Sequence, residues 1–197
     1  LSRDLHDDIG STLSSINILT SVARKKAEAG DASGAATSLA GISERSQRLQ
    51  RNMSDIVWSV DPDKDAMDDL TTRMREFGAS VLEPKDITFS LEAGADLPAS
   101  LSPELKSNIY LIFKEAVNNA AKHAQATRVD VRVRKEEGAL RMTVADNGKG
   151  IAPDKSDANG GGNGLRNMRE RASQINARLA IEASAALGTT VDLRLHG

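Results

Sequence analysis

The sequence has no cysteine, few aromatic residues and little net charge. Without cysteine, this chain of 197 residues has no disulfide, no thiolate metal site and no cysteine nucleophile, which suits a reducing compartment. Aromatic residues make up 3% of the chain, which argues against recognition of single-stranded nucleic acid by base stacking. A formal net charge of -2 argues against a general polyanion binder. We therefore expect no direct contact with nucleic acid.

Long apolar runs are also missing. No run approaches the ~20 residues that cross a bilayer, and no signal peptide is visible. Because the chain starts at Leu1 inside a helical pattern, we interpret it as a fragment of a longer protein. We expect this fragment to be cytoplasmic. Any membrane attachment would come through segments outside this fragment.

What is present is an ordinary globular composition in two differently patterned halves. Hydrophobic residues make up 39% and charged residues 27% of the chain, and its length is enough for one large or two small domains. The predicted domains are residues 1–62, an acidic linker at 63–69, and residues 70–197.

The first domain is predicted to be a helical hairpin. Apolar residues recur at steps of three or four over 1–29 and again over about 34–60, where Leu39 and Met53 belong to the apolar side. Gly30 and Asp31 interrupt the pattern, and Asp31 or Ser33 can cap the second helix. A hairpin alone buries too little apolar surface, so a second copy would complete a four-helix bundle. We therefore expect a homodimer through the hairpin.

The second domain mixes helical and strand patterns. Ser102 and Pro103 form a typical start for a long helix, and Glu137-Gly138 forms a turn between two alternating strands. Helices are predicted over 70–82, 103–124 and 165–175, and strands over 87–91, 129–133, 140–144, 179–181 and 191–195. This order predicts an α+β fold with a mixed sheet covered by helices on one face.

The helix predicted up to Ala124 carries an unusual polar stripe. Glu115, Asn119 and His123 are spaced four residues apart and stack on one stripe, with Lys122 at its edge. These side chains offer oxygen ligands for a hard cation and positive donors for phosphate. Taken alone, the stripe is also compatible with a solvated helix face.

Two glycine-rich segments follow this helix. Asp146 ends a predicted strand before Gly148 and Gly150, so its carboxylate can accept a hydrogen bond from an exocyclic amine while the backbone passes close to a ring. The run from Gly160 to Gly164 precedes a helix, where backbone N–H groups can converge on phosphate. It is neither a Walker loop, because Lys-Ser/Thr does not follow Gly164, nor a dinucleotide fingerprint, because no βαβ unit surrounds it. Taken singly, the segments are also compatible with an ordinary turn and a flexible loop.

The order and spacing of these motifs resemble the ATP-binding α/β sandwich shared by gyrase, MutL and histidine kinases. The resemblance implies ATP and Mg²⁺ as ligands, with residues 152–164 as a lid. It implies that the nucleotide contacts Asn119, Lys122, His123, Asp146, Gly148, Gly150, Gly162, Gly164, Leu165 and Thr189.

The same resemblance assigns roles to these residues. Asn119 would coordinate Mg²⁺, and Glu115 would support the metal shell. Lys122 and His123 would face the phosphates, and Gly162 and Gly164 would lie near the β- and γ-phosphates. Asp146 would bind the adenine amine, and Thr189 would contact the base. The role of Glu115 stays open between supporting the ligand shell and activating a water molecule.

The first helix contains a histidine beside a carboxylate. A neutral imidazole nitrogen of His6 is a nucleophile, and Asp7 could accept the proton of the other nitrogen. Considered together with the ATP-binding fold, residues 3–7 resemble the phosphoacceptor box of sensor histidine kinases. The resemblance is to the class that pairs with NarL-type response regulators, and residues 115–124 and 164–171 match that class as well. The resemblance implies autophosphorylation of His6 by ATP, with Asp7 and Glu115 as further catalytic residues, and phosphotransfer to a response-regulator aspartate.

One position departs from the class. Members with strong phosphatase activity carry glutamine five positions after the histidine, where this chain has Ser11. A serine hydroxyl cannot orient a water molecule as a carboxamide does, so the resemblance does not extend to phosphatase activity.

Three other functions remain alternatives. The chain could be an ATP-binding scaffold that docks a regulator without transfer, a gyrase-type ATPase with Glu115 activating water, or a serine kinase of the anti-sigma type. The pair His6-Asp7 argues against the first, the short chain against the second, and the presence of residues 1–60 against the third. The sequence identifies neither the signal nor the regulator, and it does not distinguish phosphorylation in cis from phosphorylation in trans.

Overall fold

A computed structural model describes residues 2–59, 66–150, 163–184 and 187–195. The chain divides into two compact units, Leu1–Trp58 and Ser59–Gly197. Within the described ranges, no helix combines the length and apolarity that a bilayer crossing requires. The predicted succession of a helical region and a mixed α/β domain is confirmed.

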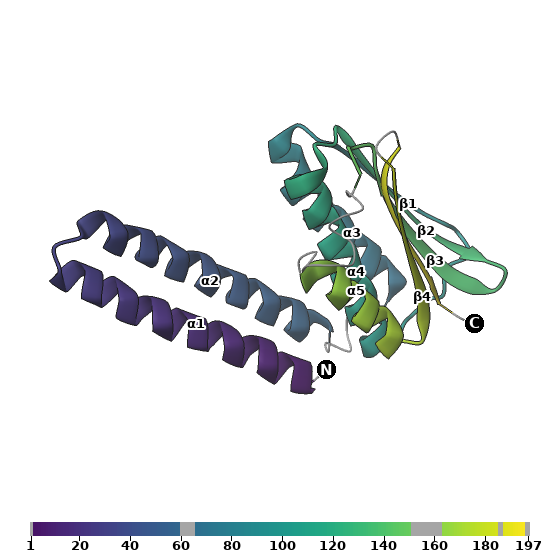
Figure 1. Ribbon diagram of the computed structural model, residues 1–197. Coiled ribbons are helices and arrows are strands. Elements are labelled where there is room, and N and C mark those ends of the chain that lie inside the picture. Colours follow the sequence, from purple (N-terminus) through teal and green to yellow (C-terminus); the bar gives the residue numbers. More distant parts are fainter. Residues whose placement is uncertain (1, 60–65, 151–162, 185–186, 196–197) are drawn as a thin grey trace. The chain divides into compact units, whose positions relative to one another are not determined.

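The first unit consists of the helices α1 (Ser2–Glu28) and α2 (Ala32–Ser59) (Figure 1). Gly30 has a φ of 79°, which favours glycine in the turn between them. The Asp31 carboxylate accepts a hydrogen bond of 2.8 Å from the backbone N–H of Gly34, so Asp31 caps α2 as predicted. The hairpin is therefore fixed by local turn and capping chemistry.

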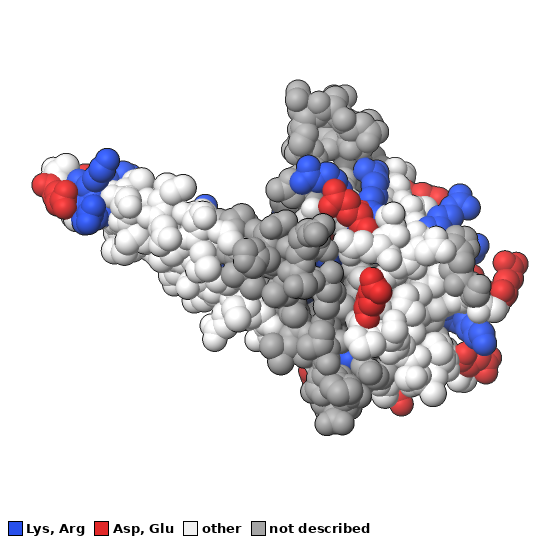
Figure 2. All heavy atoms as spheres, turned by 90° about the horizontal axis from the view of Figure 1, so that it is seen from below, with Lys and Arg blue, Asp and Glu red and all other residues white. Residues whose placement is uncertain are grey.

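Large apolar side chains of this hairpin remain in contact with solvent. Leu13, Ile18, Leu39 and Met53 are 46%, 65%, 58% and 48% exposed. The sequence places Leu39 and Met53 on the apolar side of α2, but within one chain they stay open because the facing helix covers only part of that side. Residues 10–23 and 32–43 contain no charged side chain. In the view of Figure 2, the charges of the described hairpin gather at its tip.

The second unit is a five-stranded sheet covered on one face by the helices α3 (Met67–Leu82), α4 (Pro103–Asn119) and α5 (Asn163–Gln174) (Figure 1). The spatial order of its strands is β1-β2-β3-β5-β4. Their bounds are β1 Thr88–Ala93, β2 Arg128–Glu136, β3 Ala139–Asp146, β4 Ala177–Ser184 and β5 Gly188–Leu195. β1 runs parallel to β2 and the other pairs are antiparallel, so the predicted mixed sheet is confirmed.

The core of this unit lies between α4 and the sheet. Ile109 and Phe113 of α4 are fully buried, as are Val129, Met142 and Leu193 of the sheet. The opposite face is polar, because side chains alternate along a strand. There Arg141 donates hydrogen bonds to Asp192 and Glu136, which raise the pKa of its guanidinium. The sheet is therefore held by an apolar layer on one face and by ion pairs on the other.

Most element boundaries differ by a few residues from the sequence prediction, and the start of α3 bears on the predicted linker. α3 begins at Met67 rather than at residue 70, so the last three residues of the predicted linker 63–69 are helical. Residues 63–65 lie outside the described part of the chain.

The long helix predicted to reach Ala124 changes its geometry at Asn119. α4 ends there, and the chain continues as a single π-helical turn, η3 (Ala120–Ala124), followed by Gln125 with a φ of 55°. This turn leaves Ala124 buried, with its carbonyl oxygen accepting a hydrogen bond from the backbone N–H of Lys149 at 2.9 Å. The α-helical spacing that relates Glu115 to Asn119 therefore does not extend to His123, which corrects the prediction of one continuous stripe. Short π-helical turns inside helices are frequent at functional sites.

Candidate nucleotide-binding site

The carboxylate of Asp146, at the end of β3, is held by two backbone donors. One of its oxygens, Oδ1, accepts hydrogen bonds from the N–H of Gly148 at 2.8 Å and of Thr189 at 3.2 Å. These bonds bring the turn after β3 and the start of β5 together, 43 residues apart in sequence. Within the described ranges, the other oxygen, Oδ2, accepts no hydrogen bond, so a ligand can donate one to it.

Three glycines allow the backbone to pass closely around Asp146. A Cβ atom at Gly148 would overlap the Ala124 carbonyl, and one at Gly188 would overlap the Asp146 carbonyl. Gly150 has a φ of 70°, and a Cβ atom there would lie 2.7 Å from the Ser184 carbonyl oxygen. Glycine is therefore required at these positions for packing. The role of Gly148 and Gly150 in lining a nucleotide pocket stays a prediction.

Glu115 and Asn119 lie half-buried on α4, and Glu115 faces the start of α5. A Cβ atom at Gly164 would overlap the Glu115 carboxylate. The first turn of α5, including the half-buried Leu165, thus approaches α4 at the predicted polar stripe. Among the described residues, neither Glu115 nor Asn119 has a hydrogen-bond partner, so both side chains keep free oxygen acceptors.

Lys122 and His123 lie exposed in η3. Lys122 comes three residues after Asn119, and both side chains belong to the segment against which Gly148 packs. The structure thus connects the predicted phosphate side of the site, in η3, with the predicted adenine side, around Asp146. Of the lid predicted at 152–164, residues 152–162 lie outside the described part of the chain, and Gly162 is one of them. His6 and Asp7 are in α1, but their side chains lie outside the described part of the structure.

The donor set fits Mg²⁺ bound together with a nucleotide. Among the described residues, no group of three or more histidine, cysteine or acidic side chains could hold a metal by itself. Mg²⁺ usually takes one or two carboxylate ligands and completes its shell with water and substrate phosphates. The free oxygens of Glu115 and Asn119 match that requirement.

Sequence reasoning missed Asn147, which lies between two predicted site residues. Its side-chain oxygen accepts hydrogen bonds from the N–H groups of Thr127 and Arg128, each at 2.9 Å. Its side-chain nitrogen donates to the Thr127 hydroxyl, also at 2.9 Å. An asparagine before glycine signals a turn, but partners about twenty residues away cannot be inferred from that signal.

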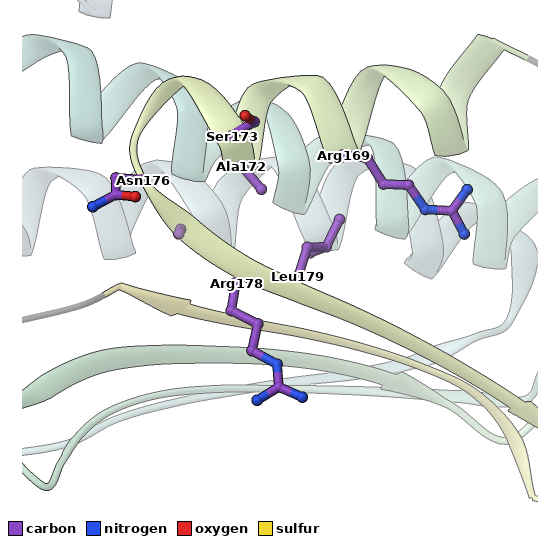
Figure 3. A pocket seen from close by; sticks show the side chains of 7 residues that line it. Arg169, Ala172, Ser173, Asn176, Arg178 and Leu179 are labelled. Atoms are coloured by element: carbon purple, nitrogen blue, oxygen red, sulfur yellow. The ribbon is translucent and has the colours of Figure 1, made fainter.

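A shallow cavity of about 260 Å³ lies elsewhere, at the far end of α5. Residues from α5 and β4 line it, including Arg169 and Arg178, but none of the predicted nucleotide residues does. Leu179 points toward α5, whereas Arg178 points to the opposite side of the sheet (Figure 3). A helix C-terminus carries partial negative charge, so this cavity is poorly suited to phosphates. The site around Asp146 is the better nucleotide candidate.

Two family matches cover most of the chain. Residues 1–65 match the family described as "Histidine kinase". Residues 105–197 match the family described as "Histidine kinase-, DNA gyrase B-, and HSP90-like ATPase". The second match includes every predicted nucleotide residue, and the first includes His6 and Asp7.

Curated relatives and solved structures agree with these matches. The sensor histidine kinase MctS of Rhizobium johnstonii is 30% identical over 97% of this chain and 41% of its own length. The sensor histidine kinase LiaS of Bacillus subtilis is 26% identical over 99% of this chain and 52% of its own length. The chain thus spans about half the length of these relatives, or less.

The fold has a counterpart among solved structures. The histidine kinase domain of the blue-light activated histidine kinase EL346 from Erythrobacter litoralis superimposes with a TM-score of 0.60 at 19% identity. That alignment covers 98% of this chain and 92% of that domain. The similarity of fold therefore extends over the hairpin and the second unit. With a histidine kinase hairpin followed by an ATPase-type domain, the chain belongs to the sensor histidine kinases.

Proposed function

We propose that this chain is the kinase core of a two-component sensor. The second unit binds ATP with Mg²⁺, His6 accepts the γ-phosphoryl group, and an aspartate of a NarL-type response regulator receives it next. The observation that carries the proposal is the meeting of Asp146, Gly148 and Thr189 at one end of the sheet, with Glu115 and Gly164 adjoining across α4 and α5. The histidine kinase match over residues 1–65 favours this function over the gyrase-type ATPase and the anti-sigma type kinase.

Asp146 selects the adenine end of the nucleotide. Its Oδ1 is already held by two backbone N–H groups, which fixes the carboxylate plane without support from the ligand. Its Oδ2 then accepts the hydrogen bond of the exocyclic amine. Because Gly188 has no side chain, its backbone can lie directly against the carbonyl of Asp146.

The phosphate end lies where α5 begins beside Glu115. A helix N-terminus presents free N–H groups and a positive partial charge to phosphate oxygens. Lys122 and His123 of η3 add positive donors. Glu115 and Asn119 provide oxygens that would hold Mg²⁺, which would neutralise phosphate charge.

The transfer reaction needs one nucleophile and one proton acceptor. A ring nitrogen of His6 attacks the γ-phosphorus, the bond between that phosphorus and the bridging oxygen of ADP breaks, and ADP leaves. Asp7 accepts a hydrogen bond or the proton from the other ring nitrogen, so positive charge on the phosphorylated ring is neutralised. In the second step the P–N bond breaks as a regulator carboxylate attacks the phosphorus. Positioning and electrostatics supply most of the catalysis.

The hairpin is proposed to dimerise as well as carry His6. Leu13, Ile18, Leu39 and Met53 expose large apolar side chains on a hairpin whose residues 10–23 and 32–43 carry no charge. A second copy of the hairpin would bury these side chains in a four-helix bundle. In this proposal residues 1–62 form the dimerising unit, and residues 70–197 form the ATP-binding unit.

Radiolabelled ATP tests the proposal. The purified chain with Mg²⁺ should acquire label that survives in base and is lost in acid, because a P–N bond is labile to acid. Chelation of Mg²⁺ should prevent labelling. Tight nucleotide binding without any label would instead favour the scaffold, and acid-stable label would favour a serine kinase.

A further inference from the structure

Asn147 ties the turn after β3 to the chain that leaves η3. Its carboxamide oxygen accepts hydrogen bonds from the backbone N–H groups of Thr127 and Arg128, and its nitrogen donates to the Thr127 hydroxyl. Its own backbone N–H donates to the Arg128 carbonyl at 3.2 Å. One residue therefore makes four hydrogen bonds to two consecutive residues on a different segment.

Two further contacts continue this connection toward η3. The N–H of Lys149 donates to the Ala124 carbonyl at 2.9 Å, and Gly148 packs directly against Ala124. The turn Asp146–Lys149 is therefore attached along its length to residues 124–128. On one side of this attachment lies Asp146, and on the other lie Lys122 and His123.

The bonds of Asn147 do little for the stability of the core. Asn147, Thr127 and Arg128 are all exposed, so alanine at position 147 would leave the two N–H groups to water at small cost. An asparagine in a turn usually bonds its own neighbouring backbone, whereas this one bonds a segment about twenty residues away. The geometry thus suits the alignment of two segments better than the formation of the turn.

We propose that Asn147 is a positioning residue that sets the distance and orientation between the adenine side and the phosphate side of the nucleotide site. The inference rests on the proposed function, since it assigns these two sides to ATP. Asn147 contacts the segments that carry the binding groups and acts through them. A rigid connection between the two sides lets one nucleotide engage both without ordering the loop on binding, which increases affinity.

The test compares variants of the 197-residue chain in binding to a non-hydrolysable ATP analogue with Mg²⁺. Asn147→Ala should weaken binding about tenfold, as expected for loss of well-placed hydrogen bonds, while the thermal midpoint stays within about 4 °C. Asn147→Asp keeps an oxygen for both N–H groups and can accept from the Thr127 hydroxyl, so it should recover affinity to within about threefold of wild type. Thr127→Val removes a single bond and should weaken binding about threefold, whereas Thr127→Ser should bind like wild type.

Ser90→Ala is the matched control. It removes a hydrogen bond of 2.6 Å between Ser90 and Asp130, which joins β1 and β2 and leaves all bonds of Asn147 in place. It should leave nucleotide affinity unchanged, with a thermal shift comparable to that of Asn147→Ala.

The proposal is overturned if folded Asn147→Ala binds as tightly as wild type, or if Ser90→Ala weakens binding to the same extent. It is also overturned if Asn147→Asp is as weak as Asn147→Ala. If Asn147→Ala does not fold, equal affinities of Thr127→Val and Thr127→Ser would overturn it, and a weaker Thr127→Val would support it. A wild-type chain that binds no ATP analogue would overturn the proposed function itself, which distinguishes the two failures.

Discussion

The two units of this chain differ in how they bury their apolar side chains. In the second unit, Ile109, Phe113 and Met142 have no exposed surface. In the hairpin, Ile18 and Leu39 remain 65% and 58% exposed. The second unit therefore has a complete core within one chain, whereas the hairpin has only part of one.

This difference assigns a different requirement to each unit. Burying a leucine or isoleucine side chain contributes about 1.5–3 kcal/mol, so the exposed side chains of two hairpins could together stabilise a dimer substantially. In the proposed function the second unit binds a ligand instead, where Asp146, Glu115 and Asn119 offer oxygen acceptors. Variants should therefore separate nucleotide binding from dimerisation.

The largest expected effect concerns Asp146. Asp146→Ala removes the acceptor for the adenine amine and leaves the N–H groups of Gly148 and Thr189 without their partner, so ATP affinity should fall about 100-fold. Calorimetric titration with an ATP analogue measures the affinity, and sedimentation should give an unchanged dimer. Asp192→Ala is the control, because Asp192 pairs with Arg141 on the open face of the sheet. Equal losses in the two variants would refute the assignment of Asp146.

The next effect concerns the hairpin. Ile18→Ala together with Leu39→Ala should weaken the dimer by about 30-fold or more, because each truncation removes apolar area from the proposed interface. Sedimentation equilibrium measures the dissociation constant. ATP affinity should stay at the wild-type value, the reverse of the pattern expected for Asp146→Ala. A dimer unaffected by both truncations would place the interface elsewhere.

A smaller effect is expected where α5 meets α4. Gly164→Ala forces the Glu115 carboxylate away from its position, because the added Cβ atom would overlap it. Binding of the ATP analogue with Mg²⁺ should weaken about tenfold. Gly94→Ala is the matched control, since its Cβ atom would meet no atom closer than 3.6 Å. If both variants bind alike, the contact between Glu115 and α5 does not contribute to the site.

The smallest effect concerns the polar face of the sheet. Burial raises the pKa of Asp130, but hydrogen bonds from Ser90 and Arg128, with the charges of Arg128 and Arg132, lower that pKa below its ordinary 3.8. A carboxylate with a lowered pKa stabilises the fold above its ordinary pKa and loses this contribution as the pH falls through the folded pKa. Asp130→Asn should therefore cost about 0.5 kcal/mol at pH 7.

Denaturant unfolding of the second unit at several pH values measures this effect. The difference between Asp130→Asn and wild type should shrink as the pH falls below about 3.8. The hairpin should be unaffected throughout. A difference that grows with acidity would contradict the sign of the shift.

The sequence could predict those features that depend on local periodicity and turn chemistry. The cap at Asp31, the turn at Glu137-Gly138 and the alternation of Val129, Val131 and Val133 each follow from neighbouring residues, and the structure has all of them. The start of α3 was predicted three residues late, because Met67 lies in an acidic stretch without apolar periodicity. Local patterns thus determine elements better than their ends.

Features that depend on distant contacts could not be predicted. The π-helical turn η3 accompanies the bond from Lys149 to the Ala124 carbonyl, and Asn147 reaches residues about twenty positions away. The order of the motifs resembles a known ATP-binding fold, and this resemblance predicts that Asp146, Gly148 and Thr189 share one site. Their shared hydrogen bonds depend on the register of β3 and β5, which the sequence does not show. The same register explains why Gly188 must be glycine.

The most direct test of the central claim, that one unit binds ATP and the other accepts its phosphoryl group, is His6→Gln. Labelling from radiolabelled ATP and affinity for the ATP analogue should be measured on the same preparations as wild type. The account predicts that His6→Gln loses all acid-labile label while its ATP affinity remains within about twofold of wild type, because His6 contributes chemistry rather than ground-state binding. Undiminished label in His6→Gln would contradict the account.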